Sequence, residues 1–327
     1  MSQDIPFHIL ADHGLPEFFN PYRIRVLLTN SLFNKRLFRM PLLRLLPVVA
    51  LGCKCWWVSV RHRGPAPFVT CSTGSSFVFA LLQYLCRPLI RPRTHVMYDL
   101  LLERKRTGLM GLFDSIKMHV FRKVVDHAVV WGPPDIDSFS REYDIPTEKF
   151  SFVPYHLTLE NFQFDISDQG YIFAGGNNGR DYPTLIDAVS KIDYPVFIAT
   201  QLPEVIEIAA PFPNIMVKPV THEQFRQKMA GCHMFVEAHP VDFFRTAGHQ
   251  TFLNAMWMGK LVVLADEKSA IGYIEDGKDG LVVAAGDAEG LKAKIQLALN
   301  DLDLSTRLAK AAQSKARDPK YRNLNHT

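Results

Sequence analysis

The chain has 327 residues, of which 47% are hydrophobic and 21% are charged. This composition excludes an intrinsically disordered chain, and the length is enough for two domains of about 150 residues each. The five cysteines are odd in number and scattered, which excludes a disulfide framework and favours a reducing, cytoplasmic compartment.

The formal net charge of +4 is distributed unevenly along the chain. Twelve Arg or Lys residues and no Asp or Glu lie between Phe18 and Met97. Aromatic and aliphatic residues are interleaved with these cations, so we expect this part to face an anionic membrane surface rather than nucleic acid. A solvated basic face over an ordinary core is the alternative. The longest apolar run, residues 45–53, is too short to span a bilayer, so we expect a peripheral position at the inner face of the membrane.

Short apolar runs alternate with helical patterns through the first half of the chain. We predict strands over residues 6–11, 68–71, 95–98 and 128–131, and helices over residues 34–50, 77–86 and 109–125. Loops at the carboxyl ends of parallel strands commonly hold ligands. We therefore predict an acceptor side formed by Asp12, His13, Gly14, Ser72, Thr73 and Gly74. Asp99, which follows another strand, could act as an acid or base or could cap the next segment.

The same alternation resumes after a polar linker over residues 156–169. We predict strands over residues 171–174, 196–199, 215–217, 233–237 and 261–265, and helices over residues 183–192, 222–230 and 288–300. The whole pattern predicts an α/β protein with two Rossmann-like lobes whose parallel sheets face a central cleft. The predicted lobes are residues 1–160 and 161–305, followed by a polar tail over residues 306–327 that packs back on the first lobe.

One stretch is more specific than this alternation. Residues 245–287 read RTAGHQTFLNAMWMGKLVVLADEKSAIGYIEDGKDGLVVAAGD, which predicts a loop, a helix, a buried strand, a short helix and a hairpin-like close. A glycine loop at a helix start presents N–H groups and a positive dipole end, which suits a diphosphate. The stretch resembles the nucleotide-sugar half of family 4 glycosyltransferases, which have the GT-B fold. Residues 131–155 resemble the segment that closes the first domain in that family.

The resemblance implies transfer of a sugar from a nucleoside-diphosphate-sugar donor to a glycan or lipid-linked acceptor. It also implies retention of the donor's anomeric configuration, with no metal and no other cofactor. The chain departs from the family at its paired glutamates, which are replaced by Thr246 and Asn254. Two alternatives therefore stay open: a catalytically impaired GT-B-like binding module and a nucleotide-sugar epimerase.

The resemblance also implies a donor site made of two loops. Arg180 and Arg245 are expected to stabilise the departing diphosphate, with Asp99 as the carboxylate of the other lobe. Asn254 would bond the ribose hydroxyls in place of the glutamate, or would make a polar packing contact instead. The other predicted donor-binding residues are Gly175, Gly176, Asn177, Asn178, Thr246, Ala247, Gly248, His249, Gln250 and Thr251. For His249, a capping or packing role is the alternative.

Overall fold

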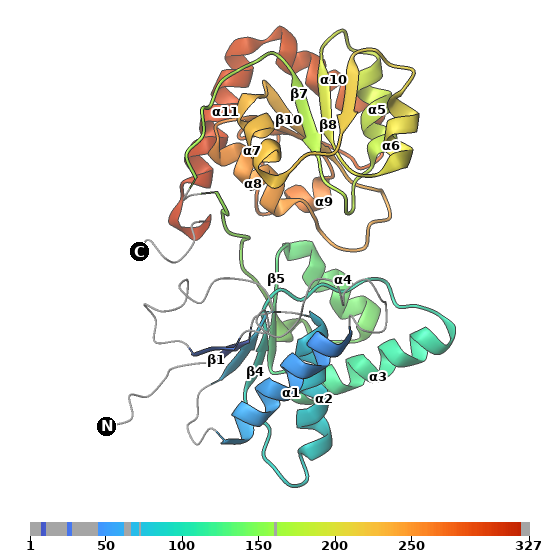
Figure 1. The fold of residues 1–327 in the computed structure, drawn as a ribbon, viewed down its shortest axis with the longest axis vertical. Coiled ribbons are helices and arrows are strands. Elements are labelled where there is room, and N and C mark those ends of the chain that lie inside the picture. The colour runs from blue at the N-terminus through green and yellow to red at the C-terminus, as the bar shows by residue number, and fades with distance from the viewer. Residues whose placement is uncertain are drawn as a thin grey trace. The chain divides into compact units, whose positions relative to one another are not determined.

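The computed structural model describes residues 8–10, 25–27, 45–61, 67–71, 73–159 and 162–321. The chain divides into two compact units, Met1–Val153 and Pro154–His326. Each unit is built on one six-stranded sheet in which every described strand pairing is parallel (Figure 1). The predicted α/β class, with two Rossmann-like lobes, is therefore confirmed.

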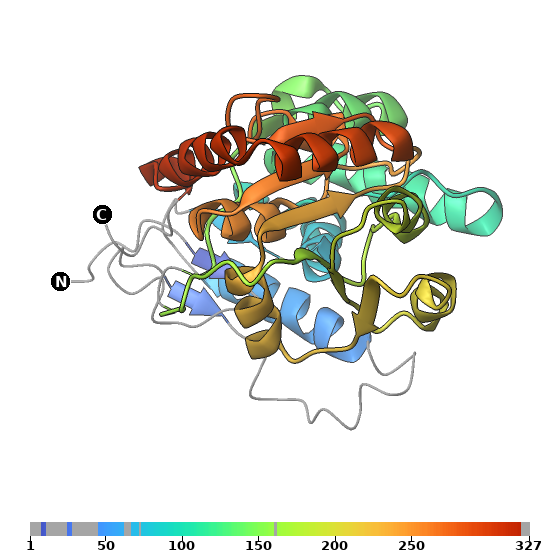
Figure 2. The same ribbon diagram turned by 90° about the horizontal axis from the view of Figure 1, so that it is seen from above.

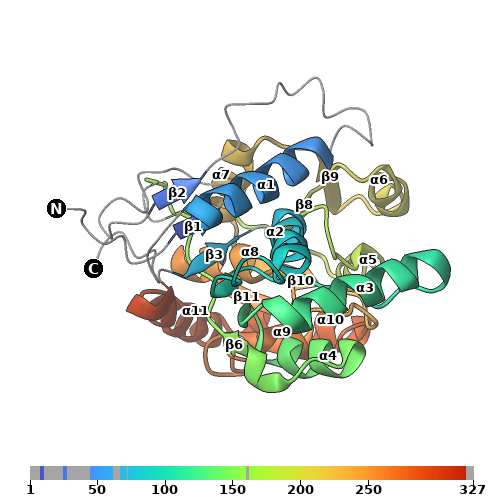
Figure 3. The ribbon, with the colours of Figure 1, turned by 90° about the horizontal axis from the view of Figure 1, so that it is seen from below.

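The first unit orders its strands β2-β1-β3-β4-β5-β6. The strands are β1 His8–Leu10, β2 Arg25–Leu27, β3 Phe68–Thr70, β4 His95–Met97, β5 His127–Val130 and β6 Phe150–Phe152. The helices are α1 Leu45–Arg61, α2 Thr73–Cys86, α3 Gly108–Val124 and α4 Pro133–Tyr143, with a short 3-10 turn at Thr147–Lys149. Figure 3 shows α1, α2 and α3 lying in sequence along one side of this sheet.

The helix predicted over residues 34–50 is corrected by the structure. Residues 34–44 lie outside the described part of the chain, and α1 continues to Arg61. Its apolar contacts are spaced as a helix requires, since Leu51 and Cys55 are both buried in one cluster with Phe68 and Phe79.

The second unit orders its strands β12-β11-β10-β7-β8-β9. The strands are β7 Ile172–Gly175, β8 Val196–Ala199, β9 Ile215–Lys218, β10 Met234–Ala238, β11 Leu261–Ala265 and β12 Leu281–Val283. The helices are α5 Tyr182–Ser190, α6 Pro203–Ala209, α7 His222–Gly231, α8 His249–Trp257, α9 Glu267–Ala270, α10 Ala288–Asn300 and α11 Leu302–Ala316, with a 3-10 turn at Pro319–Tyr321. Figure 2 shows helices on both faces of this sheet.

Two segments at the end of the second unit differ from the predictions. The segment expected to end in a hairpin-like turn instead forms the strand β12. This strand pairs with β11 in parallel, because α9 carries the chain back to the same end of the sheet. The predicted boundary at residue 305 falls inside α11, whose buried residues include Leu308 and Ala312. That the end of the chain contacts the first lobe stays a prediction. Within the described ranges, no helix is long and apolar enough to cross a membrane.

The strand orders define one switch point in each sheet. From β7 the second sheet grows through β8 and β9 in one direction, and β10 then joins on the other side of β7. In the first sheet the same reversal lies between β1 and β3. Loops diverge at the carboxyl ends of the strands at such a point, so it is where open α/β sheets bind ligands. In the second unit these loops are residues 176–181 and 239–248.

Candidate functional site

Arg180 joins the two loops at the switch point of the second sheet. Its Nε donates to the carbonyl of Gly175 at 3.2 Å, and its Nη1 donates to the carbonyl of Asn178 at 3.1 Å. Its Nη2 donates to Thr251 Oγ1 at 3.1 Å and lies 3.2 Å from Glu237 Oε1. Every nitrogen of the guanidinium therefore has a partner, and the side chain is only 9% exposed. Arg180 fixes the loop after β7 to the start of α8.

A buried group of charged side chains continues from Arg180 across the sheet edge. His239 Nε2 lies 2.8 Å from Glu237 Oε1 and 3.1 Å from Arg180 Nη1, and His239 Nδ1 lies 2.8 Å from Asp266 Oδ2. Asp266 also accepts from Ser269 Oγ at 2.5 Å. We call Arg180, Glu237, His239 and Asp266 the buried polar cluster. It connects the carboxyl ends of β7, β10 and β11.

The protonation states in this cluster follow from burial and pairing. Burial by itself would lower the pKa of His239, but its hydrogen bonds to Asp266 and Glu237 outweigh burial, and the pKa is raised. Burial would likewise raise the pKa of Asp266, but the hydrogen bond and charge of His239 and the hydrogen bonds from Ser269 together outweigh it, and the pKa is lowered. The cluster therefore favours a charged His239 beside an ionised Asp266. Glu237 Oε2 is buried without a hydrogen-bond partner among the described residues.

Gly248 is required by the geometry of the loop before α8. Its φ angle is +79°, a left-handed value that residues with a Cβ adopt at a cost. A Cβ built on Gly248 would lie 1.7 Å from Glu237 Oε1 and 2.9 Å from His239 Cε1. A larger residue would therefore displace the buried polar cluster. The glycine that sequence analysis assigned to the donor loop brings its backbone against these charges.

His249 is the first residue of α8 and is buried inside the unit. Its ring centroid lies 4.5 Å from that of Tyr273 and 5.5 Å from that of Phe252, and its Nε2 has no partner in the described chain. Burial lowers the pKa of His249 to about 3, with a smaller contribution from His239. The packing role proposed as the alternative therefore describes this side chain, while a contact with phosphate or sugar stays a prediction.

We expect His249 to make the protein less stable in mild acid. The folded state holds the ring neutral, whereas the unfolded chain binds a proton below a pKa of about 6.5, so stability is fully present above pH 6.5 and falls as the pH drops toward 3. Between pH 7 and pH 5 this contribution amounts to about 2 kcal/mol. Urea unfolding of the wild type and of His249→Leu should show that the variant loses less stability over this interval.

The exposed histidine at position 222 provides the control for this comparison, because His222→Leu changes the same residue type in the same unit. Asp266, Arg180 and Arg245 also act on His249 and are unchanged in both variants. If the free energy of unfolding falls equally with pH in the wild type and in His249→Leu, the ring gains a proton without leaving its place.

Asn254 holds the polar linker onto α8. Its Nδ2 donates to Thr158 Oγ1 at 2.9 Å, and its Oδ1 accepts from the backbone N–H of Thr158 at 3.3 Å. Gln250 Nε2 also donates to Thr158 Oγ1, at 3.2 Å. The amide is therefore used within the second unit, as a polar packing contact. The predicted ribose contact stays a prediction and would have to share this amide.

The remaining predicted donor residues lie on the same loops. Asn177 Oδ1 accepts from Thr200 Oγ1 and from the backbone N–H of Gln201, each at 2.9 Å. The guanidinium of Arg245 lies 5.1 Å from the ring centre of Phe243. Gly176 has a φ of +127°. Thr246 is buried, with 4% of its surface exposed, and the N–H of the next residue, Ala247, donates to Ser269 Oγ at 3.0 Å. Their positions agree with one site, and their roles toward a donor stay predictions.

In the first unit, Asp99 and Thr73 lie together at the carboxyl edge of the sheet. Thr73 Oγ1 donates to the carbonyl of Asp99 at 3.3 Å, and Asp99 Oδ1 accepts from Trp131 Nε1 at 2.5 Å. Asp99 has a φ of +64°, in the left-handed region that Asp adopts more readily than most residues with a Cβ. Gly74 packs in α2 beside Val48. The predicted residues Asp12, His13, Gly14 and Ser72 lie outside the described residues.

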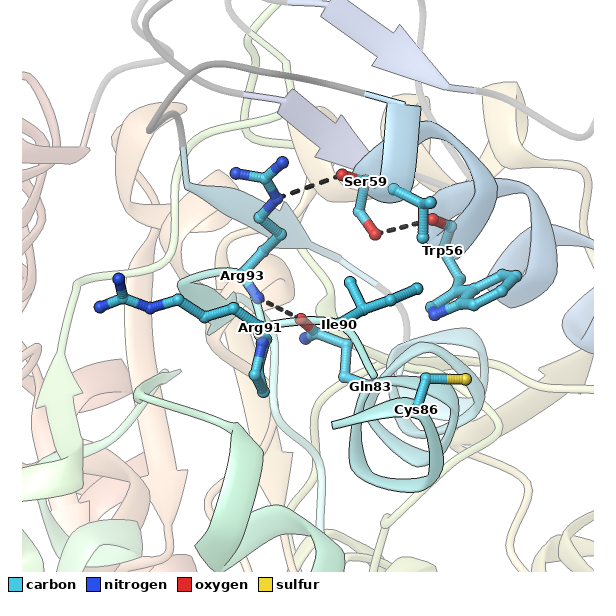
Figure 4. A pocket seen from close by; sticks show the side chains of 9 residues that line it. Trp56, Ser59, Gln83, Cys86, Ile90, Arg91 and Arg93 are labelled. Atoms are coloured by element: carbon cyan, nitrogen blue, oxygen red, sulfur yellow. Dashed lines mark hydrogen bonds between the residues drawn. The ribbon is translucent and has the colours of Figure 1, made fainter. Parts of the chain in front are cut away.

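A shallow hollow lies at the opposite, amino-terminal edge of the first sheet. Figure 4 shows Trp56 and Ser59 of α1 beside Gln83 of α2 and the segment that leads into β4. Arg93 Nε donates to the carbonyl of Ser59 at 3.1 Å, and the Arg93 N–H donates to Gln83 Oε1 at 2.6 Å. These polar groups hold two helices and a loop together. The hollow therefore has a structural explanation and lies away from the strand ends that hold ligands in this class of fold.

Sequence analysis missed Glu237, His239 and Asp266 as members of the site. Glu237 is a carboxylate within β10, every residue of which is buried. A charge in such a strand is costly unless it is paired, so it should have signalled a buried partner. Asp266 follows directly on the fully buried strand β11, where an aspartate marks the turn into α9.

Comparison with known proteins found one family model that matches part of the chain and several solved structures of similar fold. Residues 250–315 match the model of the family described as glycosyl transferases group 1. The chain is similar to a glycosyltransferase from Rickettsia africae, at 14% identity and a TM-score of 0.64, over 97% of this chain and 86% of that one. It is similar to HepE of Anabaena in complex with UDP-glucose, at 14% identity and a TM-score of 0.68, over 97% and 95% of the two chains.

A third similar structure is a TarM variant from S. aureus in complex with UDP, at 12% identity and a TM-score of 0.61. The match covers 84% of this chain and 56% of that one. No curated protein sequence matches the chain. Structural likeness at such low identity shows the shared fold, which is GT-B as predicted.

Proposed function

We propose that this chain, which has the GT-B fold and matches glycosyl transferases group 1 over residues 250–315, is a glycosyltransferase that takes a UDP-sugar as its donor. The match confirms the predicted family resemblance. The observation that carries the proposal is the joining of two glycine-containing loops by Arg180 at the switch point of the second sheet. The structures of HepE and of the TarM variant hold UDP-glucose and UDP, respectively, which favours uridine diphosphate as the nucleotide.

The proposed donor site places the diphosphate at the start of α8. There the helix dipole and the N–H groups of the first turn favour negative charge. Arg245 lies in the same loop and would add a cation where charge develops on the departing diphosphate. Arg180, with all its nitrogens engaged, would act mainly by holding the two loops at a fixed separation. The acceptor would be a glycan or a lipid-linked sugar, and the product would keep the donor's anomeric configuration.

The experiment that tests this function is incubation of the protein with UDP-glucose, with and without candidate acceptors, followed by NMR of the products. Transfer or slow hydrolysis with release of UDP supports a glycosyltransferase, and the anomeric coupling of the product reports retention or inversion. A changed sugar still attached to UDP would instead identify an epimerase. Binding of UDP-glucose without any turnover would identify an impaired binding module, which the replacement of both family glutamates motivates.

Calorimetric titration of Asn254 variants should separate its two proposed roles. If the amide also contacts the ribose, Asn254→Ala should weaken UDP binding by about 1 kcal/mol, or about fivefold. Asn254→Glu should bind UDP at least as tightly as the wild type, since a carboxylate accepts from both hydroxyls. The penalty of Asn254→Ala should vanish with 2′-deoxy-UDP.

Thr158→Val is the matched control, because it removes the side-chain bond to the linker and leaves the amide in place. If Thr158→Val and Asn254→Ala weaken both nucleotides equally, Asn254 acts only by holding the linker.

A further inference from the structure

The exposed side of α3 carries apolar residues in the pattern that normally marks a buried face. Leu109, Leu112, Phe113 and Ile116 recur at helical spacing and are 84%, 59%, 57% and 54% exposed. The opposite side of the helix is buried and includes Met118 and other core residues. We call these four exposed residues the apolar face of α3. A face of this size on a single helix is unusual for a surface in contact only with water.

Basic residues surround the apolar face. Over residues 101–123 there are six Arg or Lys residues and two Asp or Glu residues. One of the two acids, Asp114, is 5% exposed and is neutralised by Arg106 at 2.7 Å. Arg104 and Lys105 precede the helix, and Lys123 is exposed at its other end. Two further acids lie beside these residues: Glu142 accepts from the Lys105 N–H at 2.8 Å, and the Asp144 carboxylate lies 3.8 Å from the Arg122 guanidinium. Six basic residues against four acidic ones leave a smaller excess of positive charge around the apolar residues.

We propose that the apolar face of α3 docks on an anionic lipid surface. Leu, Phe and Ile side chains would enter the boundary between head groups and acyl chains, and the flanking Arg and Lys would lie among the phosphates. This surface differs from residues 18–97, the basic stretch that sequence analysis singled out. The charge around the face selects lipid over a second copy of this chain, whose matching face would bring the same positive charges together.

The position of α3 gives the docking a consequence for the acceptor. The helix follows β4, so its first turn and Asp99 both come from the carboxyl edge of the first sheet, joined by residues 100–107. Figure 3 shows the N-terminal end of α3 extending past α2. Docking through this end would hold the predicted acceptor edge close to lipid, which suits a lipid-linked acceptor. This last step rests on the proposed glycosyltransferase function, whereas the docking itself does not.

Vesicle sedimentation without nucleotide tests the docking alone. The full chain should sediment with vesicles of phosphatidylcholine and phosphatidylglycerol, less with phosphatidylcholine alone, and less as salt rises. The variant Leu112→Glu/Phe113→Glu should bind the anionic vesicles at least about tenfold more weakly, since it removes two apolar side chains that would enter the lipid and adds two negative charges. Circular dichroism should show that it keeps the fold, because both positions face solvent.

The matched control is Ile206→Glu/Leu302→Glu, which makes the same change of charge at exposed apolar residues of the second unit. The chain already has four tryptophans, so the reporter signal is the difference from the wild type. For Leu112→Trp this difference spectrum should shift to the blue on anionic vesicles, and for Leu302→Trp it should not. Equal binding by both double variants, or no spectral shift at position 112, would overturn the proposal. Light scattering that finds a dimer in the wild type and a monomer only in the α3 variant would also overturn it, in favour of self-association.

Discussion

Replacing Gly248 with alanine should destabilise the second unit by about 2–4 kcal/mol more than the same replacement at Gly277. Both glycines have left-handed φ angles, +79° and +72°, so the backbone strain of the two changes is similar. Nothing lies within 4 Å of a Cβ at Gly277, whereas a Cβ at Gly248 would meet Glu237 Oε1 at 1.7 Å. Thermal and urea unfolding of the two variants would measure the difference.

The same pair of variants tests the donor site. Gly248→Ala must move the Glu237 carboxylate and with it Arg180, so we expect it to lose UDP binding beyond the range of a calorimetric titration. Gly277→Ala should keep the affinity of the wild type. Similar stability and similar affinity for the two variants would mean that the loop before α8 relaxes freely and that the buried polar cluster does not fix it.

Arg180→Met should cost about 3–5 kcal/mol of stability, because it leaves Glu237 buried with one of its two cationic partners removed. Glu237→Gln in the same chain should restore part of this loss, since the neutral amide no longer needs a cation. A double-mutant cycle on Arg180 and Glu237 should therefore give a coupling energy above about 1 kcal/mol. Additive effects of the two changes would show that the pair contributes little beyond its separate contacts.

The Lys191–Glu289 pair provides a matched control for this cycle. It is also an ion pair in the second unit, at 2.7 Å, but both side chains are well exposed. Exposed pairs contribute at most about 1 kcal/mol, so Lys191→Met and Glu289→Gln should each change stability little. A small loss of stability at this exposed pair would show that the larger loss in Arg180→Met comes from burial rather than from the loss of any ion pair.

The elements predicted best from the sequence are those with apolar runs and clear ends. The strands 196–199 and 261–265 and the helix 288–300 match the structure to the residue. The helix α11 was missed because small residues make its contacts: Ser305, Ala312 and Ala316 are buried beside Leu308. Such a face contributes little to a hydrophobic pattern, although it packs closely on its neighbours.

The sequence predicted which loops form the candidate site but not the side-chain contacts within it. The glycines at 175, 176 and 248 marked loops because glycine permits backbone angles and close approaches that other residues do not. The partners of Arg180 could not be predicted, since they depend on β10 pairing beside β7 rather than on any local pattern. Of the two roles left open for Asn254, the sequence could not favour the packing contact, because its partner Thr158 is 96 residues away along the chain.

The separation of the two loops along the chain has a consequence for folding. Arg180 and His239 are 59 residues apart, and they meet because β10 pairs directly with β7 in the completed sheet. Closing a segment of this length has an entropic cost that only the completed sheet offsets. A nucleotide that needs both loops can bind only the finished unit, so at one hundred times its dissociation constant it would stabilise that unit by about 2.7 kcal/mol. Donor supply would then raise the fraction of the second unit that is folded at equilibrium.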